Sequence, residues 1–298
     1  MKVLLLGCNG QVGWELQRSL STLGEVVALD FDSPGDLCAD FSQPDSLRAL
    51  VRKLAPEVIV NAAAHTAVDK AESEPDFART LNATAPGVLA QEAAARGALL
   101  VHYSTDYVFD GSGSHARDET AATGPLSVYG RTKLEGEDAI RASGCRHLIL
   151  RTSWVYAARG GNFARTMLRL AAERDALTVI DDQIGAPTGA DLLADVTAHA
   201  LRRLRADADL SGTYHCVAGG ETHWFGYARH VIEWARAHAL SVKVAPDAVK
   251  AVPATAFPLP APRPLNSRLN TQKLRSTFDL QLPHWQIGVE RMLTEIAR

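Results

Sequence analysis

A tyrosine and a lysine stand four residues apart in the stretch SVYGRTKLEGE, which covers residues 127 to 137. On a helix, side chains at positions i and i+4 lie on one face, with Cβ atoms roughly 5–6 Å apart. The phenol of Tyr129 and the ammonium of Lys133 can therefore reach the same small molecule. Such pairs are common on polar helices, so the meaning of this one depends on the residues that accompany it.

Polar side chains end a neighbouring apolar run in VHYSTDYVFDG, where Ser104, Thr105 and Asp106 follow one another. In a doubly wound sheet, ligands bind outside the carboxyl ends of the strands. The helix that carries Tyr129 and Lys133 begins shortly afterwards. We therefore expect these groups to meet around one bound carbonyl.

Tyr129 is the candidate proton donor for the reduction of a ketone, because hydride transfer builds negative charge on the carbonyl oxygen. A phenol ordinarily titrates near ~10. A cation ~4 Å away interacts with the phenolate by ~4 kcal/mol at an effective dielectric constant of ~20, which would lower that pKa. We expect Lys133 to supply this charge and to hold the nicotinamide ribose. Thr105 would bond the substrate oxygen.

The first apolar run leads into GCNGQVG, which contains Gly7, Gly10 and Gly13. Glycine suits a turn with positive φ and a close approach of the backbone to a diphosphate. The helix that follows offers free N–H groups and its positive dipole end to that anion. At the first strand-to-helix junction of an alternating chain, this pattern predicts dinucleotide binding.

Acidic residues after the second apolar run give information on the choice between NAD and NADP. Asp30 can accept hydrogen bonds from a ribose hydroxyl. No arginine stands beside it to receive a 2′-phosphate, which favours NAD over NADP. Asp40 and Phe41 are candidates to border the adenine.

Short apolar runs alternate with helical patterns from KVLLLG to HLILRTS. This alternation predicts an α/β fold with a Rossmann-type doubly wound parallel sheet. Beyond it, prolines crowd into residues 253–264, which excludes a regular helix or a central strand there. We expect two domains. Residues 1–178, with a return segment at 190–215, should form a dinucleotide-binding domain. Residues 216–298, with 179–189, should form a smaller C-terminal α/β substrate domain.

Composition limits the class of protein. The 298 residues are 46% hydrophobic and carry a net charge of −3, which gives no electrostatic footprint for nucleic acid or a membrane surface. No run reaches the roughly 18 apolar residues of a membrane span, and the first apolar run is too short for a secretory leader. The four scattered cysteines lack the spacing of a zinc site or a disulfide framework, so we expect reduced thiols in a cytoplasmic protein.

These motifs together resemble the extended short-chain dehydrogenase/reductase superfamily, whose members use a Ser/Thr, Tyr and Lys triad. Within it, the chain resembles the dTDP-4-dehydrorhamnose reductase family in segments that span almost its whole length. They include GCNGQVGWELQR, VNAAAHTAVDKAESEP, HYSTDYVFDG, VYGRTKLEGE, RTSWVYA, GAPTGADLLAD and RPLNSRLNT. The resemblance implies reduction of the C4 keto group of dTDP-4-dehydro-β-L-rhamnose by NADPH or NADH, the last step of dTDP-L-rhamnose synthesis.

The resemblance also implies the site residues. Cofactor contacts are expected at Gly10, Gln11, Val12, Asp30, Asp40, Phe41, Ala64, His65, Thr66, Tyr103, Tyr129 and Lys133. Substrate contacts are expected at Thr105, Asp106, Tyr129 and Trp154. The segment RPLNSRLN looks like a loop that closes over the nucleotide-sugar, where Arg263 and Arg268 would offset diphosphate charge by bidentate hydrogen bonds.

Members of this family are commonly homodimers, and some are described as holding Mg²⁺ between acidic side chains at the subunit contact. The corresponding positions are Glu15, Asp191 and Glu295. Asp191 is shorter than the glutamate expected there, which weakens the Mg²⁺ prediction. Solvated surface carboxylates are the alternative interpretation.

Three other functions are compatible with parts of this pattern. A nucleotide-sugar dehydratase pairs an Asp with a Glu after the threonine, but here Asp106 is followed by Tyr107. An epimerase of the same superfamily would leave no net oxidation. A non-catalytic NAD(P)-binding subunit, such as the regulatory β subunit of methionine adenosyltransferase, is similar in fold family but would not turn over substrate.

Overall fold

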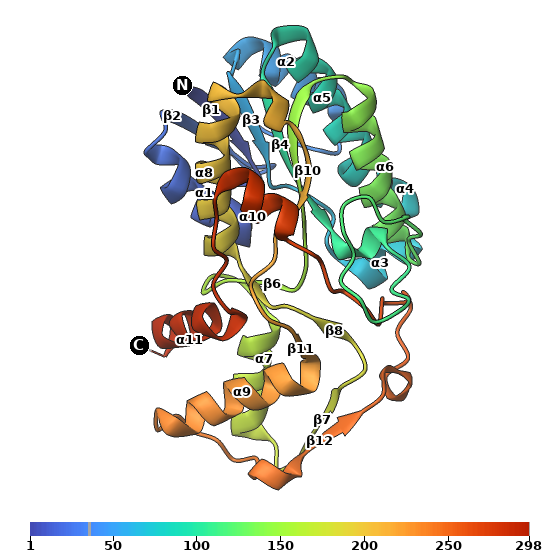
Figure 1. Ribbon diagram of the computed structural model, residues 1–298, viewed down its shortest axis with the longest axis vertical. Helices are drawn as coiled ribbons and strands as arrows, with labels where there is room; N and C mark the ends of the chain where they lie inside the picture. Colours follow the sequence, from blue (N-terminus) through green and yellow to red (C-terminus); the bar gives the residue numbers. More distant parts are fainter. Residues whose placement is uncertain (35–36, 298) are drawn as a thin grey trace.

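A six-stranded parallel sheet forms the centre of the protein (Figure 1). The computed structural model describes residues 1–34 and 37–297. The sheet order is β10-β5-β4-β3-β1-β2, with bounds β1 (Lys2–Leu6), β2 (Glu25–Leu29), β3 (Val58–Asn61), β4 (Leu99–Thr105), β5 (Arg146–Thr152) and β10 (Gly212–His215). The chain moves from β1 out to β2 and returns to β3 on the other side of β1, so the topological switch point lies between β1 and β3.

Helices cover both faces of this sheet because alternate residues of each strand point to opposite sides. Val3 and Leu5 of β1 join the core that includes α1, α8 and α10, whereas Leu4 and Leu6 join the core with α2, α5 and α6. The helix bounds are α1 (Gln11–Ser21), α8 (Ala190–Ala206), α10 (Gln272–Phe278), α2 (Pro44–Leu54), α5 (Ala85–Arg96) and α6 (Val128–Ala142). The predicted α/β fold with a doubly wound parallel sheet is confirmed.

A smaller α/β unit with its own core lies below the sheet in Figure 1. Its helices are α7 (Phe163–Glu173), α9 (Trp224–Ala237) and α11 (Trp285–Ile296). Short strand pairs complete it: β7 (Leu177–Ile180) with β12 (Val249–Val252), β8 (Ile184–Gly185) with β11 (Thr222–His223), and β6 (Val155–Tyr156) with β9 (Thr188–Gly189).

The cores in which α7, β7 and α10 are packed indicate which unit each of these elements belongs to. Helix α7 contributes Ala164, Met167 and Ala171 to the core of the smaller unit, and β7 pairs with β12 of that unit. Conversely, Leu274 and Phe278 of α10 belong to the core of the sheet. We therefore propose that α7 and β7 belong with the smaller unit, and that α10 belongs with the sheet domain.

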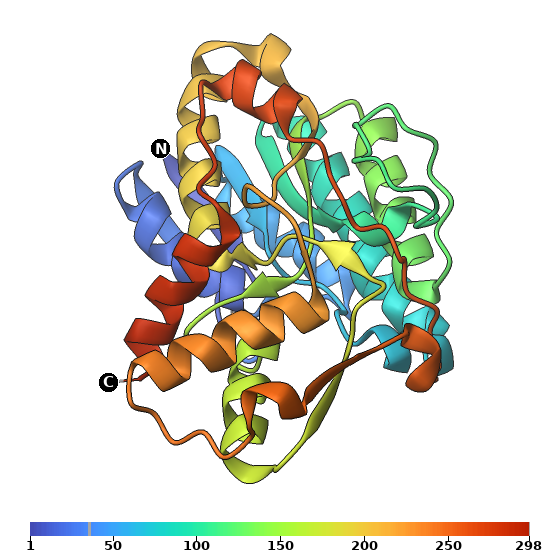
Figure 2. The same ribbon diagram turned by 60° about the horizontal axis from the view of Figure 1, so that its bottom comes forward.

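Several short elements connect these layers. They are α3 (Val68–Ser73), α4 (Pro75–Arg79), the π-helical turn η1 (Thr80–Thr84) and the 3₁₀ turns η2 (Asp106–Val108), η3 (Ala208–Leu210), η4 (Pro246–Ala248) and η5 (Ala254–Ala256). Figure 2 shows the chain leaving the smaller unit after β12 and running along the sheet domain to α10. We call residues 253–270 of this path the strap. As expected from its prolines, the strap contains no long helix or central strand.

Two further observations concern the class of protein. No helix within the described ranges is long and apolar enough to cross a membrane. Cys8, Cys38, Cys145 and Cys216 are all free thiols.

Candidate active site

A cavity of about 990 Å³ opens at the carboxyl ends of the strands, beside the switch point. Most residues predicted to bind a cofactor line it: Gly7, Gly10, Gln11, Val12, Asp30, Asp40, Phe41, Ala64, Thr66, Tyr103, Tyr129 and Lys133. Gly13, His65 and Thr105 do not line it. The glycine turn and the helix that carries Tyr129 therefore line the same cavity.

The glycine turn brings α1 close to β1 and β3. Gly7 has φ +81°, and a Cβ there would lie 2.6 Å from the Ala63 nitrogen. A Cβ at Gly13 would overlap the Gly7 carbonyl oxygen. Glycine at position 13 therefore allows α1 to pack closely against the Gly7 turn, behind the cavity wall. Helix α1 begins at Gln11 with no side-chain cap. Its first N–H groups are thus available to a diphosphate.

Acidic side chains border the cavity at the ends of β2 and the following loop. The Asp30 carboxylate accepts hydrogen bonds from the backbone of Asn9 (2.9 Å) and Phe31 (2.8 Å). Asp40 accepts hydrogen bonds from the backbone and hydroxyl of Ser42. Among the described lining residues, Lys133 is the only basic side chain.

Helix α6 carries the phenol and amine inward. Its first turn is capped by Ser127, whose hydroxyl accepts a hydrogen bond from the Gly130 N–H (3.2 Å). Tyr129 hydrogen-bonds Thr105, which lowers the pKa of the phenol, but burial outweighs this bond and raises that pKa to about 12. The structure thus brings Thr105, Tyr129 and Lys133 to one end of the cavity, although Thr105 lies behind its surface.

The Lys133 side chain contacts two groups of β4. Its Nζ donates a hydrogen bond to the Tyr103 carbonyl oxygen (2.6 Å) and contacts His102 Nε2 (3.1 Å). Both partners belong to β4, and burial lowers the pKa of Lys133 itself to about 8. Desolvation dominates the pKa of the phenol in this arrangement, and the effect of a charged Lys133 on Tyr129 stays a prediction.

Asp106 is a buried carboxyl beside the triad. Thr105 Oγ1 donates a hydrogen bond to its Oδ1 (3.0 Å), whereas its Oδ2 is buried without a hydrogen-bond partner; nearby Ser267 of the strap lowers the pKa of this carboxyl. Burial nevertheless raises the pKa of Asp106 to about 6. This carboxyl thus lies between Thr105 of β4 and Ser267 of the strap.

This shift predicts a pH dependence of stability. Asp106 has a pKa of about 6 in the folded protein, whereas aspartates in the unfolded chain titrate near ~3.9. Ionisation therefore favours the unfolded chain, and this carboxyl destabilises the fold increasingly as pH rises from about 4 to about 6. The free energy of unfolding of Asp106→Asn, relative to the parent, should therefore rise by ~2 kcal/mol between about pH 4 and pH 7. Urea unfolding of both proteins across this range measures the difference.

Asp110→Asn is the matched control for this series. Hydrogen bonds from the Ser112 backbone and hydroxyl lower the pKa of Asp110, so its contribution is lost only as pH falls below about 4, and the relative stability of Asp110→Asn should stay nearly constant from about pH 4 to pH 7. A difference between Asp106→Asn and the parent that stays constant across the pH range would contradict the assignment.

Trp154 lies where β5 passes into the smaller unit. Its φ is +49°, an unusual backbone conformation for a bulky residue. The indole is half-buried and stacks on Trp224, with ring centroids 3.8 Å apart. A Cβ at Gly185 would lie 2.9 Å from the ring, so glycine allows this close packing. Trp154 therefore stands between the two units.

The two strap arginines are already paired. Arg263 forms a bidentate pair with Asp69 (3.0 and 2.7 Å), and Arg268 bonds Glu221 (2.7 Å). Neither guanidinium lines the cavity. Any diphosphate that binds them would have to exchange with these carboxylates.

Comparisons with known proteins identify the family of this chain. A family model described as the RmlD substrate binding domain matches residues 1–298. The dTDP-4-dehydrorhamnose reductase of Shigella flexneri is 57% identical over 296 residues, which cover 99% of this chain and 98% of that protein. The chain belongs to the dTDP-4-dehydrorhamnose reductase family.

Solved structures of the same family are similar throughout. The dTDP-4-dehydrorhamnose reductase of Clostridium acetobutylicum has a TM-score of 0.88 at 34% identity, covering 100% of both chains. That of Bacillus anthracis, solved in complex with NADP, has a TM-score of 0.86 at 34% identity, covering 99% of both chains. The family resemblance predicted from the motifs is confirmed.

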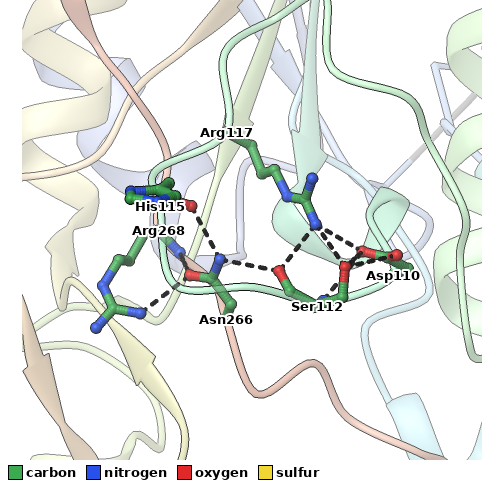
Figure 3. Close-up of polar contacts among 6 residues, drawn as sticks. All are labelled: Asp110, Ser112, His115, Arg117, Asn266 and Arg268. Carbon is green, nitrogen blue, oxygen red and sulfur yellow. Dashed lines mark hydrogen bonds and ion pairs between the residues drawn. The ribbon is translucent and has the colours of Figure 1, made fainter.

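In this member of the dTDP-4-dehydrorhamnose reductase family, an asparagine ties the strap to the loop after η2 (Figure 3). The amide nitrogen of Asn266 donates to the carbonyl oxygens of Ser112 (3.2 Å) and His115 (2.9 Å). Its amide oxygen accepts from the backbone and the guanidinium of Arg268 (3.2 Å each). Arg117 fastens the same loop, with a guanidinium bond to Asp110 (2.9 Å) and a backbone bond to the Arg268 carbonyl (3.0 Å).

Asn266→Ala should loosen this attachment. Losing buried hydrogen bonds of this kind costs ~1–3 kcal/mol, which predicts a rise of KM for the nucleotide-sugar of about 5-fold to 100-fold. The Kd for the cofactor should stay within about twofold, since the glycine turn is untouched. Steady-state kinetics and cofactor titration measure the two constants. Asn270→Ala, at an exposed site in the same strap, is the control, and equal KM values for the two variants would contradict the role of Asn266.

Other buried polar residues that sequence analysis missed also hold the site together. Asn82, in the π-helical turn, bonds both backbone groups of His65 (2.9 and 3.1 Å) and the Thr132 hydroxyl (3.1 Å). Glu137 accepts hydrogen bonds from Ser104 and Arg151. Glu137 follows Lys133 by four residues, so helical spacing could have pointed to it. Nothing in its local sequence marks Asn82.

The predicted metal ligands come near one another on α1, α8 and α11. Burial and the charges of Asp191 and Glu295 raise the pKa of Glu15. Asp191 already bonds Arg291 (2.6 Å), and Arg18 lies 3.7 Å from Glu15. Within residues 1–34 and 37–297, no group of three His, Cys, Asp or Glu side chains could hold a metal ion.

Proposed function

We propose that this protein reduces the C4 keto group of dTDP-4-dehydro-β-L-rhamnose to give dTDP-β-L-rhamnose, with NADPH or NADH as reductant. The observation that carries this proposal is the full-length match to curated dTDP-4-dehydrorhamnose reductases at up to 57% identity, with Tyr129 and Lys133 at the wall of one cavity. An oxidoreductase of the short-chain dehydrogenase/reductase type follows from the family.

The residues of the cavity fit a nicotinamide dinucleotide. The Gly7 turn leaves no room for a Cβ, and the uncapped start of α1 offers N–H groups to a diphosphate. Reduced nicotinamide supplies a hydride when bound. Asp30 would accept bonds from the adenosine ribose, and Lys133 would donate to the nicotinamide ribose.

Residues of the chain would supply the proton that the substrate oxygen receives. Thr105 would donate a hydrogen bond to the substrate C4 oxygen and orient the carbonyl. Tyr129 would give its phenolic proton to that oxygen as negative charge develops. Because burial raises the pKa of this phenol to about 12, it stays protonated until the reaction begins. Trp154 and the strap would hold the sugar and nucleotide from the other side.

The direct test is an assay of NADPH and NADH oxidation on addition of the dTDP-keto-sugar. Stoichiometric loss of reduced nicotinamide, with dTDP-rhamnose as product, is expected. An epimerase would convert the sugar without net oxidation, and a non-catalytic regulatory subunit would bind cofactor without turnover. Either result would overturn the proposal.

The Asp30 carboxylate gives a prediction for cofactor choice. It borders the cavity with no basic side chain nearby in the lining, so it should repel a 2′-phosphate. Asp30→Asn should raise the ratio of kcat/KM for NADPH to that for NADH by about tenfold, equivalent to ~1.4 kcal/mol. Asp32→Asn, an exposed carboxylate on the same loop, is the control. An unchanged ratio in Asp30→Asn would place the ribose elsewhere.

We also propose a cytoplasmic homodimer. The free thiols favour a reducing compartment. Exposed Trp14 on α1 and Ile287 on α11 support a contact through the face that carries Glu15, Asp191 and Glu295. Light scattering should give twice the chain mass, and Ile287→Glu should reduce it. A dimer that EDTA dissociates would support Mg²⁺ shared between two chains, whereas a dimer indifferent to EDTA would remove Mg²⁺ from the proposal.

A further inference from the structure

A buried line of hydrogen bonds leads from β3 to the amine of Lys133. The Ala63 N–H donates to Asn61 Oδ1 (3.0 Å). Asn61 Nδ2 lies 3.0 Å from His102 Nδ1, and His102 Nε2 lies 3.1 Å from Lys133 Nζ. The side chains of Asn61, His102 and Lys133 are each at most 2% exposed. These three side chains are thus almost fully removed from bulk solvent, and they contact one another in line.

The donors along this line can be assigned in order. A backbone N–H only donates, so the Asn61 atom that faces Ala63 must be the amide oxygen. The Asn61 NH₂ group then faces His102 Nδ1, which must accept. A neutral imidazole with an accepting Nδ1 carries its proton on Nε2. This N–H points at Lys133 Nζ.

The last contact decides the protonation of the amine. An ammonium group has three donors and no acceptor, so it cannot receive the His102 N–H. A neutral amine has one lone pair for His102 and can still donate to the Tyr103 carbonyl oxygen, 2.6 Å away. We propose that His102, oriented by Asn61, is a positioning residue that holds Lys133 as a neutral amine in the cofactor-free protein.

The charges around the amine do not oppose this assignment strongly. His102 from β4 is kept neutral by burial, which lowers its pKa well below the ordinary value. Glu137 from α6 itself raises the pKa of Lys133, but Arg151 from β5 neutralises this carboxylate with two hydrogen bonds (2.9 and 2.7 Å). Burial is the larger effect and lowers the pKa of Lys133 to about 8.

A consequence for binding rests on the proposed function. Ribose hydroxyls of a dinucleotide would give Lys133 acceptors that His102 does not provide. The amine would then bind a proton from solvent at its lone pair, and His102 would keep its own proton. With a Lys133 pKa of about 8, about half of the amines are neutral at pH 8, so cofactor binding at this pH should take up about half a proton per chain.

The primary test needs no cofactor. In protein labelled with ¹⁵Nζ-lysine, NMR distinguishes a neutral amine from an ammonium, and Lys133→Arg identifies the signal of Lys133. We expect Lys133 to titrate at or below about pH 8 in the parent. His102→Gln offers an acceptor oxygen in place of the N–H and should raise the proton affinity of Lys133 more than about tenfold. His147→Gln, which replaces a histidine on β5 whose ring bonds the Cys145 carbonyl, should leave the titration unchanged.

Asn61→Asp is the second variant, and it covers the case that His102→Gln does not fold. A carboxylate accepts from both Ala63 and His102, so the proton of His102 should move from Nε2 to Nδ1. Imidazole ¹⁵N shifts report this exchange of tautomers directly. The proposal is overturned if His102 carries its proton on Nδ1 in the parent, or if Lys133 titrates equally in the parent and His102→Gln.

Proton uptake then tests the consequence separately. Calorimetric titration with NADPH near pH 8, in buffers of different ionisation enthalpy, should give about half a proton taken up by the parent and about a tenth or less by His102→Gln. A neutral Lys133 without cofactor binding would overturn the proposed function alone. Cofactor binding with an ammonium at Lys133 in the free protein would overturn this inference alone.

Discussion

Tyr129→Phe should lower kcat by about 10²–10⁴-fold, the usual contribution of a positioned general acid. The variant keeps the ring and its edge-on contact with Tyr107, whose centroid lies 5.5 Å away, so the cavity wall should be preserved. Only the hydroxyl that bonds Thr105 and would protonate the substrate oxygen is removed. The Kd for NADPH should stay within a few-fold, as measured by fluorescence titration.

Tyr107→Phe provides the matched control for this experiment. It removes a phenolic oxygen from the neighbouring ring, and burial also raises the pKa of that phenol. If Tyr129 donates the proton, Tyr107→Phe should retain kcat within about threefold. A Tyr129→Phe enzyme that reduces the keto-sugar at the parental rate would rule out the proton-donor role.

Glu137→Gln should destabilise the protein by ~3–5 kcal/mol, the usual effect of removing one partner from a buried ion pair. Glu137 is fully buried on α6, where it accepts two hydrogen bonds from the guanidinium of Arg151 and one from the Ser104 hydroxyl (2.5 Å). With glutamine at 137, the Arg151 charge on β5 would remain buried without a counter-charge. Urea unfolding at neutral pH gives the difference.

Asp138→Asn is the control, because this carboxylate is exposed on the same helix and pairs with Arg141. Exposed pairs contribute ~0–1 kcal/mol, so its stability should stay close to that of the parent. Equal loss in the two variants would mean that the Glu137 pair does not fasten α6 to the sheet. A selective loss would mean that this pair fastens the Tyr129 helix to β5.

The motifs that act over short distances could be predicted from sequence. The glycine turn at Gly7 depends on local backbone conformation, and the pairing of Tyr129 with Lys133 depends on helical spacing alone. Alternation of buried runs and amphipathic segments similarly specifies a doubly wound sheet, because each element must bury one face or both. Strand order then brings the ends of β1 and β4 to one cavity.

Roles that depend on residues far apart in the chain could not be predicted this way. Arg263 pairs with Asp69 across almost two hundred positions, and Asn266 reaches the loop at Ser112.

Local spacing, together with burial periodicity, was enough to determine the sheet, the glycine turn and the pairing of Tyr129 with Lys133. Only the tertiary structure decided what each charged group faces. It turned the amine of Lys133 toward His102 and the Tyr103 carbonyl, and it raised the pKa of Tyr129 by burial. The physical reason is that desolvation and hydrogen-bond direction depend on the packed surroundings of a group, which residue type and spacing do not specify.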